Sequence, residues 1–289
     1  MIRKNKIMTA ISIGAVLIMS ALLVYTSAEA NIFKSRALSG IPGLPAGCQY
    51  EEISTAAQLY ALSANTDSAA MSKNYVLMND IDLGAYQWEP IGYSAANDET
   101  GVIPFTGAFD GRGHTISNIK RDFGIAPNGW VRGFFGTIGA GGVVRNTTFV
   151  GRMQGNSWVG GLFATNNGIV EDCLIDINVY GPGGNAFCVG IHNNGITRNV
   201  VLLGKTETDG ATSKGLFGTS SGTATGIYAD ADEVLTPNYT GAGTPVADDG
   251  TRIYSHANMM LASTYTALST EKWTIADELY PVLKTLPTA

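Results

Sequence analysis

Short hydrophobic runs alternate with glycine along most of this chain, and one such phrase returns at a fixed interval. The phrase stands at four places: Gly133-Phe134-Phe135-Gly136, Gly161-Leu162-Phe163-Ala164, Gly190-Ile191-His192-Asn193 and Gly215-Leu216-Phe217-Gly218. A second phrase follows each copy, and its last residues are 26, 27 and 27 positions apart: Asn146, Asp172, Asn199 and Gly226. A fixed period of this size indicates stacked structural repeats.

The pattern within each repeat predicts strands rather than helices. Runs of three to five strand-forming residues are broken by glycine or asparagine, which tolerate the positive φ of sharp corners. One repeat cannot bury its apolar side chains alone, but parallel stacking would align them in ladders down a common axis. We therefore expect an all-β fold, a right-handed parallel β-helix (solenoid), over residues 75–253.

Both ends of the solenoid need a cover, because unpaired strand edges promote aggregation. Residues 50–74 predict an N-terminal helical cap, with Ser54 as the residue that caps a short helix starting at Ala56. The period is lost toward the C-terminus, so residues 254–289 are interpreted as an irregular C-terminal cap.

The N-terminus resembles an export signal. Residues 1–30 have a basic start, a long apolar stretch and an Ala-Glu-Ala ending, which are typical of a cleaved signal peptide; the apolar stretch is also long enough for an uncleaved signal anchor. Residues 31–49, rich in glycine, proline and serine, would be a linker. The sequence thus predicts a secreted or cell-surface protein, attached to a membrane only if this segment is retained.

The charge of the chain limits the classes of partner that the sequence favours. The formal net charge of −6 argues against nucleic acid and anionic membranes as partners, and disfavours strongly anionic glycans unless calcium bridges them.

The three cysteines, Cys48, Cys173 and Cys188, leave at least one thiol unpaired, and we interpret Cys173 and Cys188 as small buried hydrophobic residues.

The repeated Gly-hydrophobic-Phe phrase resembles the GLUG repeat of bacterial surface proteins. The stretch from Phe105 to Ile116, with its Phe-Asp-Gly-Arg-Gly-His-Thr-Ile sequence, is similar to pectin-lyase-like β-helices. The resemblance covers roughly residues 50–286 and implies an adhesin-like or accessory role. The third copy departs from it, because His192 stands where the other copies have Phe.

Catalytic chemistry has little support in the sequence. There is no His-Glu-x-x-His motif, and His114 is interpreted as a structural corner residue. Acid pairs that could serve a lyase or hydrolase are Asp82 with Asp110 and Asp172 with Asp176, although each acid also fits a turn or corner. No cofactor is expected. A calcium site remains an open alternative at one group of acidic residues: Asp230, Asp232 and Glu233.

Loop aromatics are the best candidates for ligand contact, because sugars stack on such rings and binding sites favour them. The candidates, with the unusual histidine of the third repeat, are Trp88, Trp130, Trp158 and His192. The alternative is that Trp88 and Trp158 pack beneath the coils, while His192 is partly buried and hydrogen-bonded.

We therefore expect a non-catalytic, adhesin-like binding or scaffolding protein with a glycan or extracellular protein as partner. Two alternatives remain open: a polysaccharide lyase or glycoside hydrolase, and a structural subunit that self-associates. The oligomeric state is not indicated by the sequence.

Overall fold

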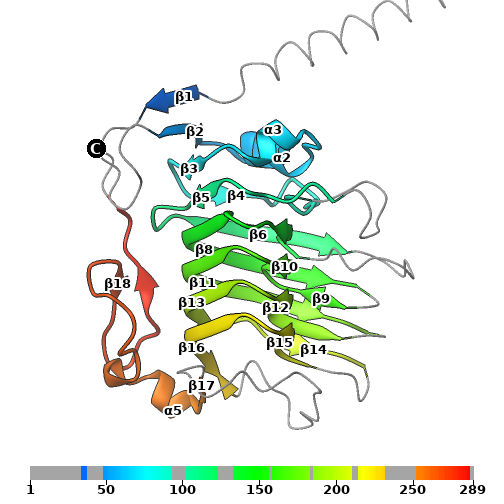
Figure 1. Cartoon of the computed structure of the whole chain (residues 1–289). Helices are drawn as coiled ribbons and strands as arrows, with labels where there is room; N and C mark the ends of the chain where they lie inside the picture. The colour runs from blue at the N-terminus through cyan, green and yellow to red at the C-terminus, as the bar shows by residue number, and fades with distance from the viewer. Residues whose placement is uncertain are drawn as a thin grey trace, which may run out of the picture. The chain divides into compact units, whose positions relative to one another are not determined.

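Parallel strands dominate the computed structural model of this protein (Figure 1). It describes residues 34–37, 48–92, 102–122, 133–155, 158–182, 185–209, 214–231 and 252–286. The chain divides into two units, Met1–Ser35 and Arg36–Ala289, and the fold below is that of the second. A strand near the boundary, β1, spans Lys34–Ala37.

The larger sheet is a stack of parallel strands, one for each coil. Its order is β2 (Gln49–Ile53), β3 (Tyr75–Leu77), β5 (Ala108–Asp110), β8 (Val143–Gln154), β11 (Ile169–Tyr180), β13 (Ile196–Leu202), β16 (Thr223–Asp230) and β17 (Arg252–Tyr254). Three strands extend this sheet sideways: β4 (Ile81–Asp82), β6 (Thr115–Asp122) and β14 (Thr206–Glu207).

A second parallel sheet faces the first. Its strands are β7 (Phe135–Ile138), β10 (Phe163–Asn166), β12 (Ala186–Asn193) and β15 (Lys214–Ser220), with β9 (Val159–Gly160) beside β12. The expected all-β parallel β-helix is thus confirmed, and the 27-residue period is its coil length. The ladder already begins at β2, inside the range expected for the N-terminal cap.

Two short helices, α2 (Ala56–Ser63) and α3 (Ser68–Met71), cover the first coils. The cap of α2 is Thr55 rather than Ser54, since the Thr55 side chain accepts a hydrogen bond from the Gln58 backbone. The Gln58 side chain accepts in return from the backbone amides of Ser54 and Thr55. This reciprocal arrangement is a capping box, and it fixes where the helix starts.

The corners of the coils are built by residues with left-handed backbone. Asn146, Asp172 and Asn199 occupy equivalent corners with φ of 49°, 50° and 55°, and Gly226 follows with φ of 59°. The Asn199 amide donates to the Asp172 carboxylate at 3.2 Å. Asparagine and aspartate tolerate this conformation better than most residues. The corner role expected for Asp172 is therefore confirmed.

The repeat is offset in its third copy. In the sheet register, Phe135, Phe163, Gly190 and Phe217 are equivalent, so His192 aligns with Thr165 and Thr219 and does not replace a Phe. A side chain at Gly190 would collide with the Phe163 ring. Glycine there leaves room for Phe163 to stack toward Phe217, with ring centroids 6.3 Å apart.

The C-terminal segment begins as a cap and then runs back along the side of the stack (Figure 1). Helix α5 (His256–Met259) follows β17, and a 3-10 turn (Ala262–Thr264) leads to the antiparallel pair β18 (Trp273–Thr274) and β19 (Val282–Leu283). We call residues 255–286 the strap.

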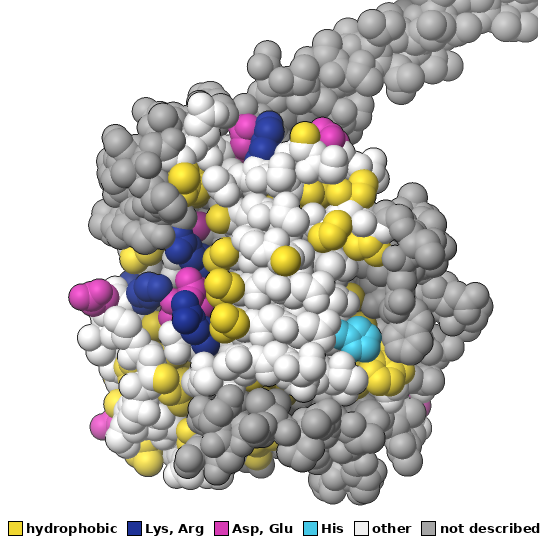
Figure 2. All heavy atoms as spheres, viewed as in Figure 1, with side chains coloured by type: hydrophobic (Ala, Val, Ile, Leu, Met, Phe, Trp, Pro, Cys, Tyr) yellow, Lys and Arg dark blue, Asp and Glu magenta, His cyan; other side chains and the backbone are white. Residues whose placement is uncertain are grey.

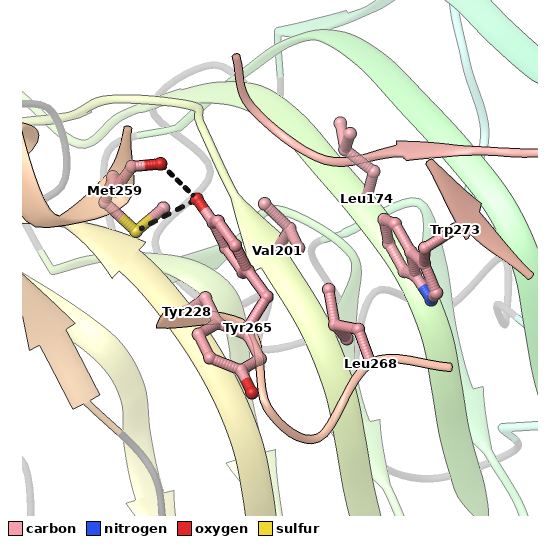
Figure 3. Packing of buried hydrophobic residues seen from close by; sticks show 7 residues of the cluster. All are labelled: Leu174, Val201, Tyr228, Met259, Tyr265, Leu268 and Trp273. Atoms are coloured by element: carbon pink, nitrogen blue, oxygen red, sulfur yellow. Dashed lines mark hydrogen bonds between the residues drawn. The ribbon is translucent and has the colours of Figure 1, made fainter. Parts of the chain in front are cut away.

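The strap covers an apolar row on the outside of the larger sheet (Figure 3). The row consists of Leu174, Val201 and Tyr228, aligned by strand register, and Trp273 is fully buried against it. Next to Trp273 in the chain, Lys272 forms an ion pair with Asp172 at 2.5 Å. At its end, Leu286 exchanges two hydrogen bonds with Arg112, near the start of the stack.

Candidate functional site

A hollow lies on the side of the stack, where β6 and β8 end. It has a volume of about 600 Å³ and is open to solvent. A second hollow of about 290 Å³ lies against β8, β11 and β14. Arg152 lines both. We call these two hollows, which share Arg152 and lie on successive coils, the groove.

The groove is floored by two rows of outward side chains in strand register. The first row is Lys120, Arg152, Asn178 and Lys205; the second is Asp122, Gln154, Tyr180 and Glu207. Between these rows, Met153, Val179 and Thr206 point inward and are buried. This alternation follows from the two-residue period of a strand, which sends successive side chains to opposite faces.

The first row is basic. Lys120, Arg152 and Lys205 are all exposed, and the Lys205 backbone amide donates to the Asn178 side chain at 2.9 Å. Arg152 also contacts the Gln154 side chain. Arg121, which also lines the first hollow, forms an ion pair with Glu89. We call Lys120, Arg152 and Lys205 the basic row.

Tyr180 supplies a held aromatic ring in the second row. Its hydroxyl donates to the Asp209 carboxylate, with oxygen distances of 2.8 and 2.9 Å. This hydrogen bond to the neutral phenol raises the pKa of Tyr180 above its ordinary value, so the ring is uncharged at neutral pH. A ring fixed beside amide and basic groups can stack on a sugar while its neighbours bind hydroxyl or acidic groups.

Sequence reasoning missed the groove. The residues that line it lie in the second halves of the long strands, outside the repeated phrases that draw attention. A signal was nevertheless present, because Asn178 and Lys205, and Tyr180 and Glu207, are each separated by the 27-residue period. Exposed residues at that spacing form rows on a solenoid.

Trp88 is a core residue, which corrects its place among the ligand candidates. Its side chain is fully buried, its ring stacks on Phe134 at 4.3 Å, and its indole N–H donates to the Phe134 carbonyl at 2.9 Å. The buried alternative therefore holds. Trp130 lies outside the described residues.

The structure brings Trp158 and His192 together at the surface of the second sheet. Both side chains are half-buried, with ring centroids 6.0 Å apart and rings nearly parallel. Trp158 also packs on Phe187, and the His192 Nδ1 lies 2.8 Å from the Thr219 hydroxyl. We call Trp158 and His192 the Trp158 patch. It is a second surface that could meet a ligand.

The acids proposed for catalysis have structural partners. Asp110 is fully buried, with an ion pair to Arg145 at 3.0 Å, and Asp172 is held by Asn199 and Lys272. The exposed Asp82 accepts hydrogen bonds from Asn118 and Gly84, which lower its pKa.

The histidine and calcium candidates also lie in structural contacts. His114 lies 3.1 Å from Asp80, in agreement with its corner role. Asp230 is fully buried and accepts a hydrogen bond from Tyr280 at 2.7 Å, while Asp232 and Glu233 lie outside the described residues. Within the described ranges, no three His, Cys, Asp or Glu side chains converge as metal ligands would.

The expected burial of Cys173 and Cys188 is confirmed. Cys173 and Cys188 are buried and unpaired, whereas Cys48 is half-buried and unpaired. Burial raises the pKa of the Cys188 thiol to about 12, and raises that of Cys173 as well. Both thiols therefore stay protonated at neutral pH.

Part of the chain is similar to parts of two known proteins. It is 34% identical over 131 residues to a halomucin of Haloquadratum walsbyi, a match that covers 42% of this chain and 1% of the halomucin. It is 32% identical over 114 residues to a putative Gly-rich membrane protein of Evansella cellulosilytica, covering 36% of this chain and 12% of that protein.

The chain therefore spans only a small part of the curated relatives that it matches. No protein-family profile matches it, and no solved structure matches it significantly. Among the described residues, no helix is both long and apolar enough to cross a bilayer. The β-solenoid and these partial likenesses are compatible with a surface protein.

Proposed function

We propose that this protein is a non-catalytic, secreted or cell-surface β-solenoid that binds a glycan in the groove. The observation that carries the proposal is the groove itself, whose two open hollows share Arg152 on successive coils and hold a fixed tyrosine ring. A chain polymer needs an elongated site of this kind, and repeated coils present side chains at regular steps along it. The proposal includes the resemblance of the repeated phrase to the GLUG repeats of surface proteins, which is consistent with this role.

The direct test is to incubate the purified protein with a panel of soluble and insoluble polysaccharides, with and without calcium. Retention on the polymer and release of new sugar ends are measured in the same samples. We expect retention without release. Release of ends would overturn the non-catalytic assignment in favour of a lyase or hydrolase. If neither retention nor release is observed, a glycan is rejected as the ligand, and a protein partner or self-association is favoured.

Substitutions locate the site. Tyr180→Ala removes the ring and is expected to weaken retention by about tenfold, the size of one lost aromatic contact. Tyr180→Phe keeps the ring and is expected to retain most of the binding. Trp158→Ala serves as the matched control on the other surface. If Trp158→Ala abolishes retention while Tyr180→Ala does not, the Trp158 patch is the binding site and the groove is not.

A further inference from the structure

Three rows of outward side chains cross the solenoid where β8, β11, β13 and β16 begin. The first row is apolar, and strand register aligns its members: Ala108, Val143, Ile169 and Ile196, with Thr223 at its end. The second row, two residues further along each strand, is charged: Arg145, Glu171 and Arg198, with Thr225 at its end. The third row lies at the corner before these strands: Asn167, Asn194 and Ser221. We call these three rows the front face, where Figure 2 shows a column of hydrophobic side chains beside basic and acidic ones.

The apolar row lies on the outside of the sheet. Strand alternation places it there, because the next residues in each strand, Val170 and Thr197, are fully buried inside the coil. Ile169 and Ile196 are directly aligned on adjacent strands and are only half-buried, so part of each side chain still faces water. Covering this remaining apolar surface with a partner is favourable, and aligned apolar side chains at a surface are typical of interaction sites.

The charged row determines which partner fits. Its signs alternate from coil to coil, with Glu171 lying 3.9 Å from Arg145 and 2.5 Å from Arg198. The Arg198 side chain is 47% exposed, so it remains accessible to a partner. If the same row is turned end for end, Arg198 of each copy lies opposite Glu171 of the other. A carboxylate has room for several donors, so Glu171 can accept hydrogen bonds from two arginines at once.

We propose that the front face binds a second copy of this protein, antiparallel to the first, about a two-fold axis that passes between β11 and β13. In this alignment Ile169 meets the partner's Ile196, and Glu171 meets the partner's Arg198. Each contact occurs twice, once on each side of the axis, as a two-fold interface requires. A two-fold axis parallel to the solenoid would instead place the charged row of one copy against the asparagine row of the other.

The third row gives this interface a polar border. The Asn194 amide donates to the Asn167 side chain at 3.0 Å, and the Ser221 hydroxyl donates to the Asn194 side chain at 3.0 Å. Each amide has a further donor and acceptor beyond these bonds. The same antiparallel alignment places Asn167 opposite the partner's Asn194, where two amides complement each other. A polar border around an apolar strip is the usual anatomy of a protein interface.

The front face is short, so the pairing is weak. Its four coils are three strand spacings apart from end to end, which is about 14 Å along the axis. We therefore expect a dissociation constant of roughly 10 μM or weaker. This inference goes beyond the proposed glycan binding, because the front face shares no residue with the groove. A pair would carry two grooves, which strengthens attachment to a polymer that reaches both.

Sedimentation equilibrium of the purified protein, at concentrations up to about 1 mM, measures the association. We expect a monomer–dimer equilibrium. Ile169→Glu and Ile196→Lys each place a charge in the apolar row, and each variant alone is expected to weaken the dimer by about tenfold or more, because the charge loses water without gaining a partner.

Mixing the two variants tests the alignment. In a mixed dimer the new glutamate at position 169 of one copy faces the new lysine at position 196 of the other, while the two unchanged isoleucines face each other. We therefore expect the mixture to form dimers when neither variant does so alone. In an alignment that places position 169 opposite itself, each new charge faces an isoleucine and mixing restores nothing.

Matched controls separate the front face from general surface effects. Leu279→Glu and Val282→Lys make the same chemical changes at strap residues that are 61% and 52% exposed, and both are expected to leave the dimer unchanged. Tyr180→Ala, in the groove, should also leave it unchanged. Circular dichroism and thermal unfolding verify that every variant is folded.

Three outcomes would overturn the inference. A protein that stays monomeric over the whole concentration range would reject the pairing. A dimer that survives both front-face substitutions, or that the strap substitutions weaken equally, would place the contact elsewhere. Failure of the mixture to restore the dimer would refute the antiparallel alignment. None of these results bears on glycan retention, so the proposed function stands or falls by its own test.

Discussion

At the residue scale, two of the three cysteines are small, buried side chains. Cys173 lies directly behind the corner residue Asp172, where its thiol is 3.3 Å from the Glu171 carbonyl. Cys188 lies in the second sheet, with its thiol 3.2 Å from the Gly215 carbonyl. Both serve as small apolar groups with a weak donor, which is a common use of buried cysteine.

Thiol reactivity tests this role. In the native protein we expect a thiol reagent such as Ellman's reagent to modify only Cys48, because the other two thiols are buried and their pKa values are raised. In denaturant all three should react. Cys48→Ser provides the control, since it should abolish the native reaction. Modification of a second thiol without denaturant would contradict the burial of Cys173 and Cys188.

At the element scale, the strap is the part of the fold that the sequence predicted least well. The coil period and the corner residues Asn146, Asp172 and Asn199 could be predicted, because each repeat solves the same packing problem. The strap has no period, and its side-on course depends on an apolar row formed only once the coils are stacked. The groove was missed for the same reason, since its rows are a product of register.

The phrase alignment shows a related limit. His192 was aligned with Phe163 by the sequence phrase, whereas the strands align it with Thr165 and Thr219. Gly190 follows Gly161 by 29 residues, whereas the strands of these two coils pair at an offset of 27, which is a shift of two residues. Local similarity could not reveal that shift, because it depends on how Phe163 packs over Gly190. Consequently, the surface position of His192 had to come from the structure.

Trp273 anchors the strap, and its replacement tests how much the strap stabilises the coils. Trp273→Ala leaves a large cavity over the apolar row and is expected to lower the free energy of unfolding by about 3–5 kcal/mol. The indole nitrogen is buried with no hydrogen-bond partner among the described residues, so Trp273→Phe should cost clearly less. Urea denaturation followed by circular dichroism measures both. Equal stability of the alanine variant and the unmodified protein would show that the strap is not coupled to the stack.

At the scale of the whole molecule, stability is distributed along a one-dimensional stack. Each coil contacts its neighbours, so inner coils are held from both sides and outer coils from one. Strand β11 pairs with β8 on one side and with β13 on the other, whereas β17 pairs only with β16 among the described strands. The caps and the strap therefore matter most where a coil has one neighbour.

Hydrogen exchange should reveal this gradient. We expect the backbone amides of β8, β11 and β13 to exchange most slowly, and those of β17 to exchange fastest among the strands of the larger sheet. Mass spectrometry of peptic fragments measures the rates by segment. Uniform protection from β2 to β17 would contradict a stack that opens from its end.

The return of the strap to Arg112 has a mechanical consequence. Leu286 is bonded to a turn early in the stack, although the last coil lies at the other end. A tensile load applied between the first strand of the ladder and the C-terminus is therefore carried by the strap and its first attachment point. The coils that follow Arg112 stay out of the path of that force until the strap has been peeled away. If the protein is tethered at a cell surface, shear would unzip the strap while the groove keeps its shape.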